Sequence, residues 1–113
     1  MNDTIFGKIL RKEIPTDLIY EDDLSVAFND INPQAPIHIL IIPKKLIAMP
    51  QDIGDEDVEV VGNLFLVASK IAKDLKIDEG YRLIMNNGTN AGQSVFHIHL
   101  HMLSGRKLSW PPG

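Results

Sequence analysis

Three histidines stand at alternate positions of one short stretch, at His97, His99 and His101. Apolar residues precede, separate and follow them: Phe96, Ile98, Leu100 and Met102. Successive side chains of a β-strand point to opposite faces, whereas a helix would wind these histidines around its axis. We therefore predict a strand over residues 95–103, with the imidazoles on one face and the apolar side chains facing a core.

Two kinds of chemistry would use a row of imidazoles: metal binding, and acid–base or nucleophilic catalysis. One zinc ion held by all three is disfavoured, because residues i and i+4 of a strand lie about 13 Å apart while Zn–N bonds are about 2 Å long. Two of the histidines could bind zinc with a third ligand from elsewhere in the chain. The row also suits a nucleophile, since a neutral imidazole attacks phosphorus and its neighbours can orient it or bind substrate oxygens.

Two neighbouring features belong with these histidines. His38 lies in the apolar run Ile37–Ile42, which is typical of a central strand, and a buried imidazole there needs a hydrogen-bond partner. We expect that partner to be in the histidine row. The loop over residues 87–94 is small and polar and contains two glycines, so its backbone can approach a ligand closely. We expect Gly92–Ser94 to offer donors to phosphate oxygens.

The remaining elements must position these groups. A short helix capped by Thr4 is predicted over residues 5–12, and one long helix over residues 55–77. The buried stripe of the long helix is predicted to be Val61, Leu64, Phe65, Ala68, Ile71, Ala72 and Leu75. Strands are predicted over residues 19–21, 24–29, 37–42 and 81–86, in addition to the histidine strand. Together they predict an α+β fold in which a sheet of about five antiparallel strands carries the helices on one face and the histidines on the other.

Composition excludes several classes of protein. A chain of 113 residues predicts a single domain over residues 1–113, and a net charge of -4 with scattered basic residues argues against a general nucleic-acid binder. The absence of cysteine excludes disulfides, thiolate metal sites and a cysteine nucleophile. No signal peptide or bilayer-length apolar run is visible, so we expect a cytoplasmic protein without a membrane partner.

The histidine stretch has the form His-φ-His-φ-His-φ-φ over residues 97–103, where φ is apolar, and so resembles the motif of the histidine triad (HIT) superfamily. Further segments resemble its histidine triad nucleotide-binding (HINT) branch: Asp3–Ile9, Phe28–Pro36, Gly80–Arg82, Gly92–Val95 and Trp110–Gly113. The resemblance extends over essentially the whole chain.

This resemblance implies an α+β fold, usually in a homodimer whose two sheets join into one. It also implies hydrolysis of the P–N bond of purine nucleoside 5′-phosphoramidates, with no metal or other cofactor required. By position, His99 would be the nucleophile that takes the nucleotidyl group, and His101 would contact the phosphate and the leaving group. His97 and His38 would complete a hydrogen-bonded network.

The same resemblance implies a set of contacts with an AMP-like or GMP-like nucleotide. Asp30 would bind the ribose hydroxyls and Ile31 would lie against the base. The base pocket would be walled by Phe6, Ile9, Phe28 and Leu40. The ribose and phosphate would be held by Asn86, Gly92, Gln93 and Ser94.

The chain departs from the family pattern at three places. Leu46 stands where many members have histidine, and Ala91 stands where glycine is common, which stiffens the loop. Asn29 stands at a pocket position that varies, which bears on the choice of base. None of these departures removes one of the four histidines. Three alternatives stay open: hydrolysis of dinucleoside polyphosphates or nucleotidyl transfer, a nucleotide-binding regulatory module, and a zinc hydrolase. Ser94 favours phosphoramidate hydrolysis over the polyphosphate branch, where threonine is more usual.

Overall fold

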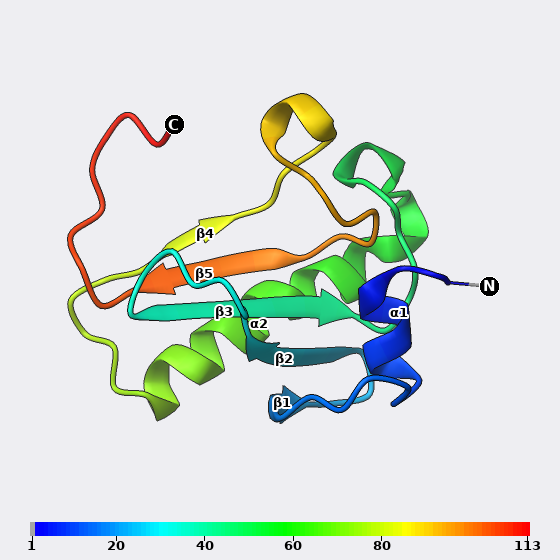
Figure 1. The fold of residues 1–113 in the computed structure, drawn as a ribbon, viewed down its shortest axis with the longest axis horizontal. Helices are drawn as coiled ribbons and strands as arrows, with labels where there is room; N and C mark the ends of the chain where they lie inside the picture. Colours follow the sequence, from blue (N-terminus) through cyan, green and yellow to red (C-terminus); the bar gives the residue numbers. More distant parts are fainter. Residues whose placement is uncertain (1) are drawn as a thin grey trace.

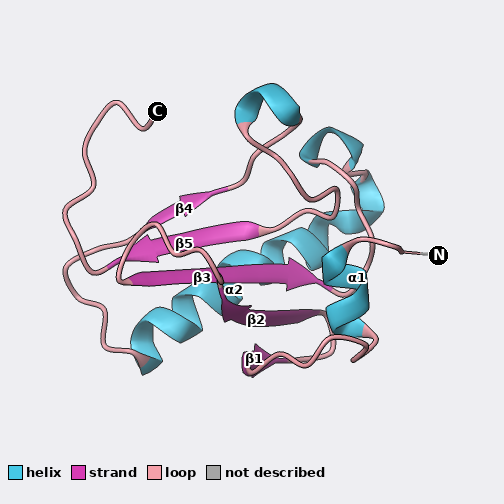
Figure 2. Ribbon diagram, in the orientation of Figure 1, coloured by secondary structure: helices cyan, strands magenta, loops and turns pink. Residues whose placement is uncertain are grey.

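Five antiparallel strands form one sheet in the spatial order β1–β2–β3–β5–β4 (Figure 1). The structure is a computed structural model and describes residues 2–113. The strands are β1 (Leu18–Glu21), β2 (Ser25–Asn29), β3 (Ile37–Pro43), β4 (Arg82–Ile84) and β5 (Leu100–Ser104). The helices are α1 (Ile5–Leu10) and α2 (Val58–Asp74), with short 3-10 turns η1 (Pro50–Asp52), η2 (Asp55–Asp57) and η3 (Thr89–Ala91) (Figure 2). The predicted α+β fold, with one long and one short helix, is confirmed.

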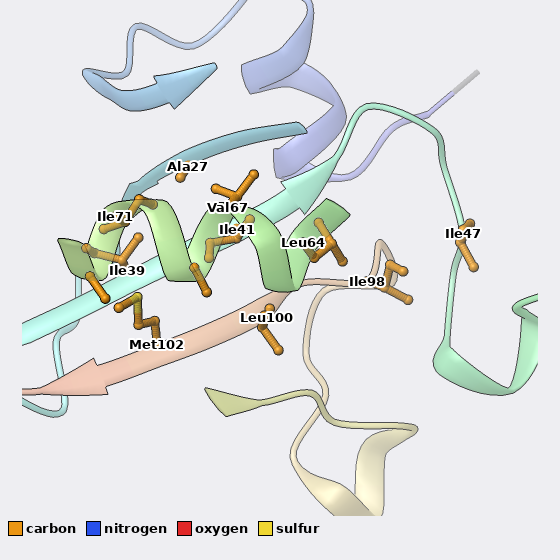
Figure 3. Close-up of a cluster of buried hydrophobic side chains, with 12 residues drawn as sticks. Ala27, Ile39, Ile41, Ile47, Leu64, Val67, Ile71, Ile98, Leu100 and Met102 are labelled. Atoms are coloured by element: carbon orange, nitrogen blue, oxygen red, sulfur yellow. The ribbon is translucent and has the colours of Figure 1, made fainter. Parts of the chain in front are cut away.

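Helix α2 covers one face of the sheet and builds the larger core there (Figure 3). Its stripe of Leu64, Val67, Ala68, Ile71 and Ala72 is buried against alternate residues of β3 and β5. The strands contribute Ala27, Ile39, Ile41, Leu100 and Met102 to this cluster. The alternate apolar side chains of the strands therefore pack against the apolar stripe of the helix, as the sequence predicts.

Helix α1 lies on the opposite face, so the prediction that both helices share one face is wrong. Phe6 packs against Phe28 of β2 with the ring centroids 5.7 Å apart, in a second cluster that includes Leu40 and Ile42 of β3. The reason is that β2 and β3 are apolar on both faces, so each face of the sheet needs a cover. Thr4 caps α1, its Oγ1 accepting a bond from the Gly7 N–H (3.0 Å).

The histidine strand is shorter than predicted. Strand β5 begins at Leu100, and residues 95–97 form a bend. On one side β4 ends at Ile84, opposite His101. On the other side β3 continues to Pro43, but its pairing with β5 stops at Ile41, opposite Leu100. The ladder therefore ends where the chain before Leu100 turns away from β3.

The bend is attached to the fold by other contacts. The Ile98 N–H donates to the Ile47 carbonyl (2.8 Å), and the Ile98 side chain enters the core under α2 as predicted. Phe96, by contrast, is 40% exposed, where the strand pattern predicted a core residue. The alternation of faces therefore holds from residue 98 onward but not before it.

The long helix also differs from its prediction at both ends. Residues 55–57 form the 3-10 turn η2, in which Asp57 accepts a bond from the Gly54 N–H (2.9 Å). Phe65 and Leu75 are about half exposed, although both were predicted to be buried. Phe65 lies one position round the helix from the buried stripe, and Leu75 is the C-cap, beyond the last helical turn. Within residues 2–113, no helix has the length and apolar character that crossing a bilayer requires.

Leu64→Ala should lower the free energy of unfolding by about 3 kcal/mol, because the fully buried side chain would leave a cavity between α2 and the sheet. Leu46→Ala is the matched control, since Leu46 is 46% exposed and its loss should cost less than about 1 kcal/mol. Urea unfolding of both variants measures the difference. Equal losses would contradict the placement of the core.

Candidate active site

A cavity of about 630 Å³ opens on the face of the sheet opposite α2. Its walls include nine of the predicted site residues: Phe6, Ile9, Phe28, Leu40, Asp30, Ile31, Ser94, His99 and His101. A second cavity of about 620 Å³ is also lined by residues 14–17, but no histidine lies in its lining, so only the first of these two cavities presents imidazoles. Its apolar walls come mainly from α1, β2 and β3, and its imidazoles are His101 of β5 and His99, which directly precedes that strand.

Sequence reasoning missed one wall of this cavity. The segment between α1 and β1 contributes Ile14, Pro15, Thr16 and Asp17, and Ile5, Asn29 and Val95 complete the lining. No periodicity marks residues 14–17, because they belong to no helix or strand. Only the fold of the chain after α1 brings them to the cavity.

The His99 ring is oriented by a backbone carbonyl. Its Nδ1 lies 2.8 Å from the His97 carbonyl oxygen, which can only accept a hydrogen bond. The proton of neutral His99 therefore sits on Nδ1, and Nε2 keeps a free lone pair. Burial lowers the pKa of His99, and the bond to the His97 carbonyl and the charge of Asp30 oppose this only in part. At neutral pH the site thus presents an uncharged imidazole.

A second chain of hydrogen bonds fixes the proton of His101. The Gln34 N–H donates to Nδ1 of His38 (3.0 Å), so the proton of His38 must be on Nε2. That nitrogen lies 2.9 Å from Nδ1 of His101, which therefore accepts. His101 keeps its own proton on Nε2. Burial, with the adjacent His99 and His38, lowers the pKa of His101 to about 4, so this proton belongs to a neutral ring.

His97 is fully buried and does not line the cavity. Its Nε2 donates to the Pro43 carbonyl (2.7 Å), and its Nδ1 lies 2.9 Å from Nδ2 of Asn2. Burial lowers its pKa as well, against the opposing effect of the Pro43 bond. Of the three alternating histidines, His99 and His101 reach the cavity, with ring centroids 4.9 Å apart, and His97 lies in the protein interior.

The glycine-containing loop is held from inside by Gln93. The buried side chain donates to the carbonyls of Ala48 (2.7 Å) and Val95 (3.0 Å), and accepts a bond from the Gly88 N–H (2.8 Å). Its amide is therefore occupied within the loop, and Gln93 is not among the residues that line the cavity. Gly92 adopts a positive φ of 100°, which glycine allows without strain.

Two more predicted residues lie beside the cavity and not in its lining. The amide nitrogen of Asn86 lies 3.8 Å from where a Cβ on Gly92 would be, so these two residues are neighbours. Ser94 is exposed and does line the cavity. The structure therefore brings Ser94 to the imidazoles and places Asn86 and Gly92 at the loop behind it.

One group of side chains within residues 2–113 could geometrically hold a cation: Asp30, His38 and His101, whose ligand atoms all lie within 4.8 Å of one another. The His38 nitrogen that faces the other two is Nε2, 3.4 Å from the Asp30 carboxylate. The bond from the Gln34 N–H places a proton on this nitrogen. A metal bound to Nε2 would displace that proton to Nδ1 and so break the bond from the Gln34 N–H. These residues therefore fit a hydrogen-bonded network better than a metal site.

The charge of the cavity follows from the same groups. Its lining contains the carboxylates of Asp17 and Asp30 and no lysine or arginine. Because burial lowers the pKa of each histidine at the site, the imidazoles add no positive charge at neutral pH. Any anion bound here is held by neutral donors.

An α+β fold with a five-stranded sheet and two adjacent imidazoles in its pocket characterises a class of protein, and comparison with known families identifies that class. A family model described as HIT domain matches residues 11–108. The chain belongs to the HIT family, as its histidine motif indicated.

Close relatives cover nearly the entire chain. An uncharacterized HIT-like protein of Synechocystis is 54% identical over 111 residues, which are 98% of this chain and 97% of that protein. The crystal structure of a HIT family hydrolase from Legionella pneumophila has a TM-score of 0.95 and 47% identity, over 98% of this chain and 100% of the other. A histidine triad nucleotide-binding protein from Candida albicans has a TM-score of 0.82 and 35% identity, over 96% and 83% of the two chains.

The pKa of His101 gives a direct test of this site. Nitrogen NMR of the imidazoles should show His101 titrating near pH 4, because burial and two imidazole neighbours disfavour its charge. Since histidine in the unfolded chain binds this proton with its ordinary pKa of about 6.5, stability should fall as the pH drops from about 6.5 to about 4. A midpoint for His101 near 6.5 would contradict the buried network.

Proposed function

We propose that this protein is a hydrolase of the HINT type that cleaves the P–N bond of purine nucleoside 5′-phosphoramidates. The observation that carries the proposal is the protonation pattern of the two imidazoles in the cavity. His99 presents a free Nε2 lone pair, and His101 presents an Nε2–H. One group can attack and the other can donate a proton, as a two-step transfer requires. The similarity to the Legionella hydrolase and the Candida nucleotide-binding protein supports it.

In the first step, Nε2 of His99 attacks phosphorus and a new N–P bond forms. The P–N bond to the leaving amine breaks, and the amine takes the Nε2 proton of His101, which a proton from solvent replaces so that the ring stays neutral. The His99 ring becomes cationic while it carries the nucleotidyl group, and the His97 carbonyl, which accepts from Nδ1–H, stabilises that charge. In the second step, water attacks phosphorus and loses a proton to solvent, and the N–P bond to His99 breaks. This frees neutral His99 and releases the nucleoside monophosphate.

The rest of the cavity suits a nucleoside. Phe6, Phe28 and Leu40 supply flat and branched apolar walls for a purine. Asp30 stands at the rim, where one of its oxygens accepts a bond from the Asn32 N–H (2.8 Å) and the carboxylate can accept from the two ribose hydroxyls. Ile31, next to Asp30 in the chain, is 96% exposed. The purine base of a bound nucleotide would cover this apolar side chain.

The charge of the cavity favours phosphoramidates over dinucleoside polyphosphates. The phosphorus of a nucleoside 5′-phosphoramidate carries one negatively charged oxygen, and neutral N–H donors can bind a single negative charge. A polyphosphate brings several charges into a lining with two carboxylates and no lysine or arginine. Phosphoramidates with a basic amine as leaving group fit these carboxylates best.

We also propose that two copies of the chain form the functional unit. Helix α2 exposes Val58, Phe65 and Leu66, three large apolar side chains on its outer surface. Gly62, among them, has open space around the position of a Cβ. Strand β4 is an edge of the sheet and could pair with a second copy. A homodimer would cover both features.

His99→Ala should reduce hydrolysis of adenosine phosphoramidate by at least about a thousandfold, because no other group in the cavity replaces the nucleophile. AMP should still bind, since the walls and Asp30 remain. Steady-state kinetics and calorimetric titration measure the two effects. A variant with normal turnover would contradict the proposal.

The same assay separates the alternatives. Faster turnover of diadenosine tetraphosphate than of adenosine phosphoramidate by the unmodified protein would favour the polyphosphate branch. AMP binding without turnover of any P–N substrate would favour a regulatory module, and loss of activity on exhaustive chelation would favour a zinc hydrolase.

Phe65→Glu should convert the dimer to a monomer, because it places a charge within the apolar surface of α2. Ile19→Glu is the matched control: Ile19 is similarly exposed, but on β1 at the other edge of the sheet. Sedimentation velocity distinguishes the states. The proposed interface is wrong if Phe65→Glu stays dimeric, or if Ile19→Glu alone dissociates.

A further inference from the structure

The orientation of His99 depends on a segment that the sheet does not hold. The carbonyl that fixes the His99 ring belongs to His97, in the bend before β5. In a strand, ladder hydrogen bonds would fix such a carbonyl. Here the position of residue 97 depends on the neighbouring Ile98–Ile47 bond and on whatever holds the His97 side chain.

Two partners hold that side chain. The carbonyl of Pro43, at the end of β3, accepts from its Nε2. On the other side of the ring, Asn2 approaches Nδ1 through its amide nitrogen (2.9 Å). The amide orientation of Asn2 is unambiguous, because its oxygen accepts from the Thr4 N–H (3.1 Å), a group that can only donate. Nδ2 of Asn2 is therefore the donor to His97.

Asn2 is itself fixed in place by the first helix. The Thr4 hydroxyl donates to Asn2 Oδ1 (2.6 Å), and Nη1 of Arg11 donates to the Asn2 carbonyl (2.6 Å). Together with the bonds to the Thr4 N–H and to His97, this makes four hydrogen bonds, to three residues, for one residue outside any helix or strand. The arrangement links α1 to the bend through a single side chain.

Gly7 provides the space for Asn2. A Cβ at Gly7 would lie 2.4 Å from Cγ of Asn2 and 2.5 Å from its carbonyl oxygen, which is closer than atoms can approach. Glycine in a helix costs stability relative to alanine, and the backbone of Gly7 does not require a positive φ. What glycine provides at this position is room for the Asn2 side chain.

We infer that Asn2 is a positioning residue: it holds the His97 imidazole against Pro43 and, through the His97 carbonyl, orients His99 for attack. The inference rests on the proposed function of His99. Asn2 is not among the residues that line the cavity. Its loss should therefore disturb the chemical step and leave nucleotide binding nearly unchanged.

Two variants remove the contact by different routes. Asn2→Ala deletes the donor, and Gly7→Ala keeps the donor but displaces it while favouring the helix. Each should lower kcat for adenosine phosphoramidate about tenfold and change KM less than about twofold, as expected for a misoriented group. Leu64→Ala is the control for lost stability alone, because Leu64 lies under α2 on the other face of the sheet. Assayed below its Tm, it should keep the kcat of the unmodified protein.

Nitrogen NMR of the imidazoles gives a readout that needs no activity. In the unmodified protein His97 should carry its proton on Nε2 alone. In Asn2→Asp a carboxylate faces Nδ1, so both nitrogens of His97 should be protonated at neutral pH. In Asn2→Ala and Gly7→Ala the His97 and His99 signals should both shift.

The outcomes separate the two proposals. Unchanged kcat together with unchanged His97 and His99 signals in Asn2→Ala would overturn the role of Asn2. If the unmodified protein fails to hydrolyse any phosphoramidate, the proposed function fails, and the signals of His99 decide alone: a shift in both variants supports the positioning role, and its absence overturns it.

Discussion

The bond between Nδ1 of His99 and the carbonyl of His97 is the constraint on which the site depends. An imidazole has two similar nitrogens, and only a fixed partner decides which one keeps the lone pair. A backbone carbonyl is a partner that cannot change its role, because it only accepts. With that bond at 2.8 Å, the nitrogen that His99 leaves free is Nε2, which keeps its basic lone pair. The chemistry proposed for the site requires this orientation.

A backbone N–H fixes the proton position of the second imidazole, His101. The N–H of Gln34, in the connector after β2, can only donate, and it donates to Nδ1 of His38. The proton of His38 is therefore on Nε2, which donates to Nδ1 of His101, so the proton of His101 is on its own Nε2. Burial keeps these rings neutral by lowering their pKa values, which removes the repulsion that several charged imidazoles would feel. The main chain and the low polarity of the interior thus assign one attacking nitrogen and one donating nitrogen without any cation in the cavity.

Sequence reasoning predicted the parts of this fold that repeat. The period of two placed Leu100 and Met102 in the core and His99 and His101 opposite them, and the helical stripe identified Leu64, Ala68 and Ile71. Features that tertiary contacts decide were not predicted. His97 lies in the bend before β5, where its ring bonds to the Pro43 carbonyl. The Gln93 side chain holds its own loop, and Asp17 reaches the cavity from a segment with no periodic pattern. The resemblance to the HIT family named nine residues of the lining, but no motif pointed to Asn2.

The central claim is that phosphorus passes through a bond to His99, and the stereochemistry of the reaction tests it most directly. Each in-line displacement at phosphorus inverts its configuration, so two successive displacements restore it. An adenosine phosphoramidothioate of one configuration, hydrolysed in isotopically labelled water, reports the result in its product. The account predicts net retention of configuration at phosphorus. Net inversion would mean that water attacks the substrate directly, and would contradict it.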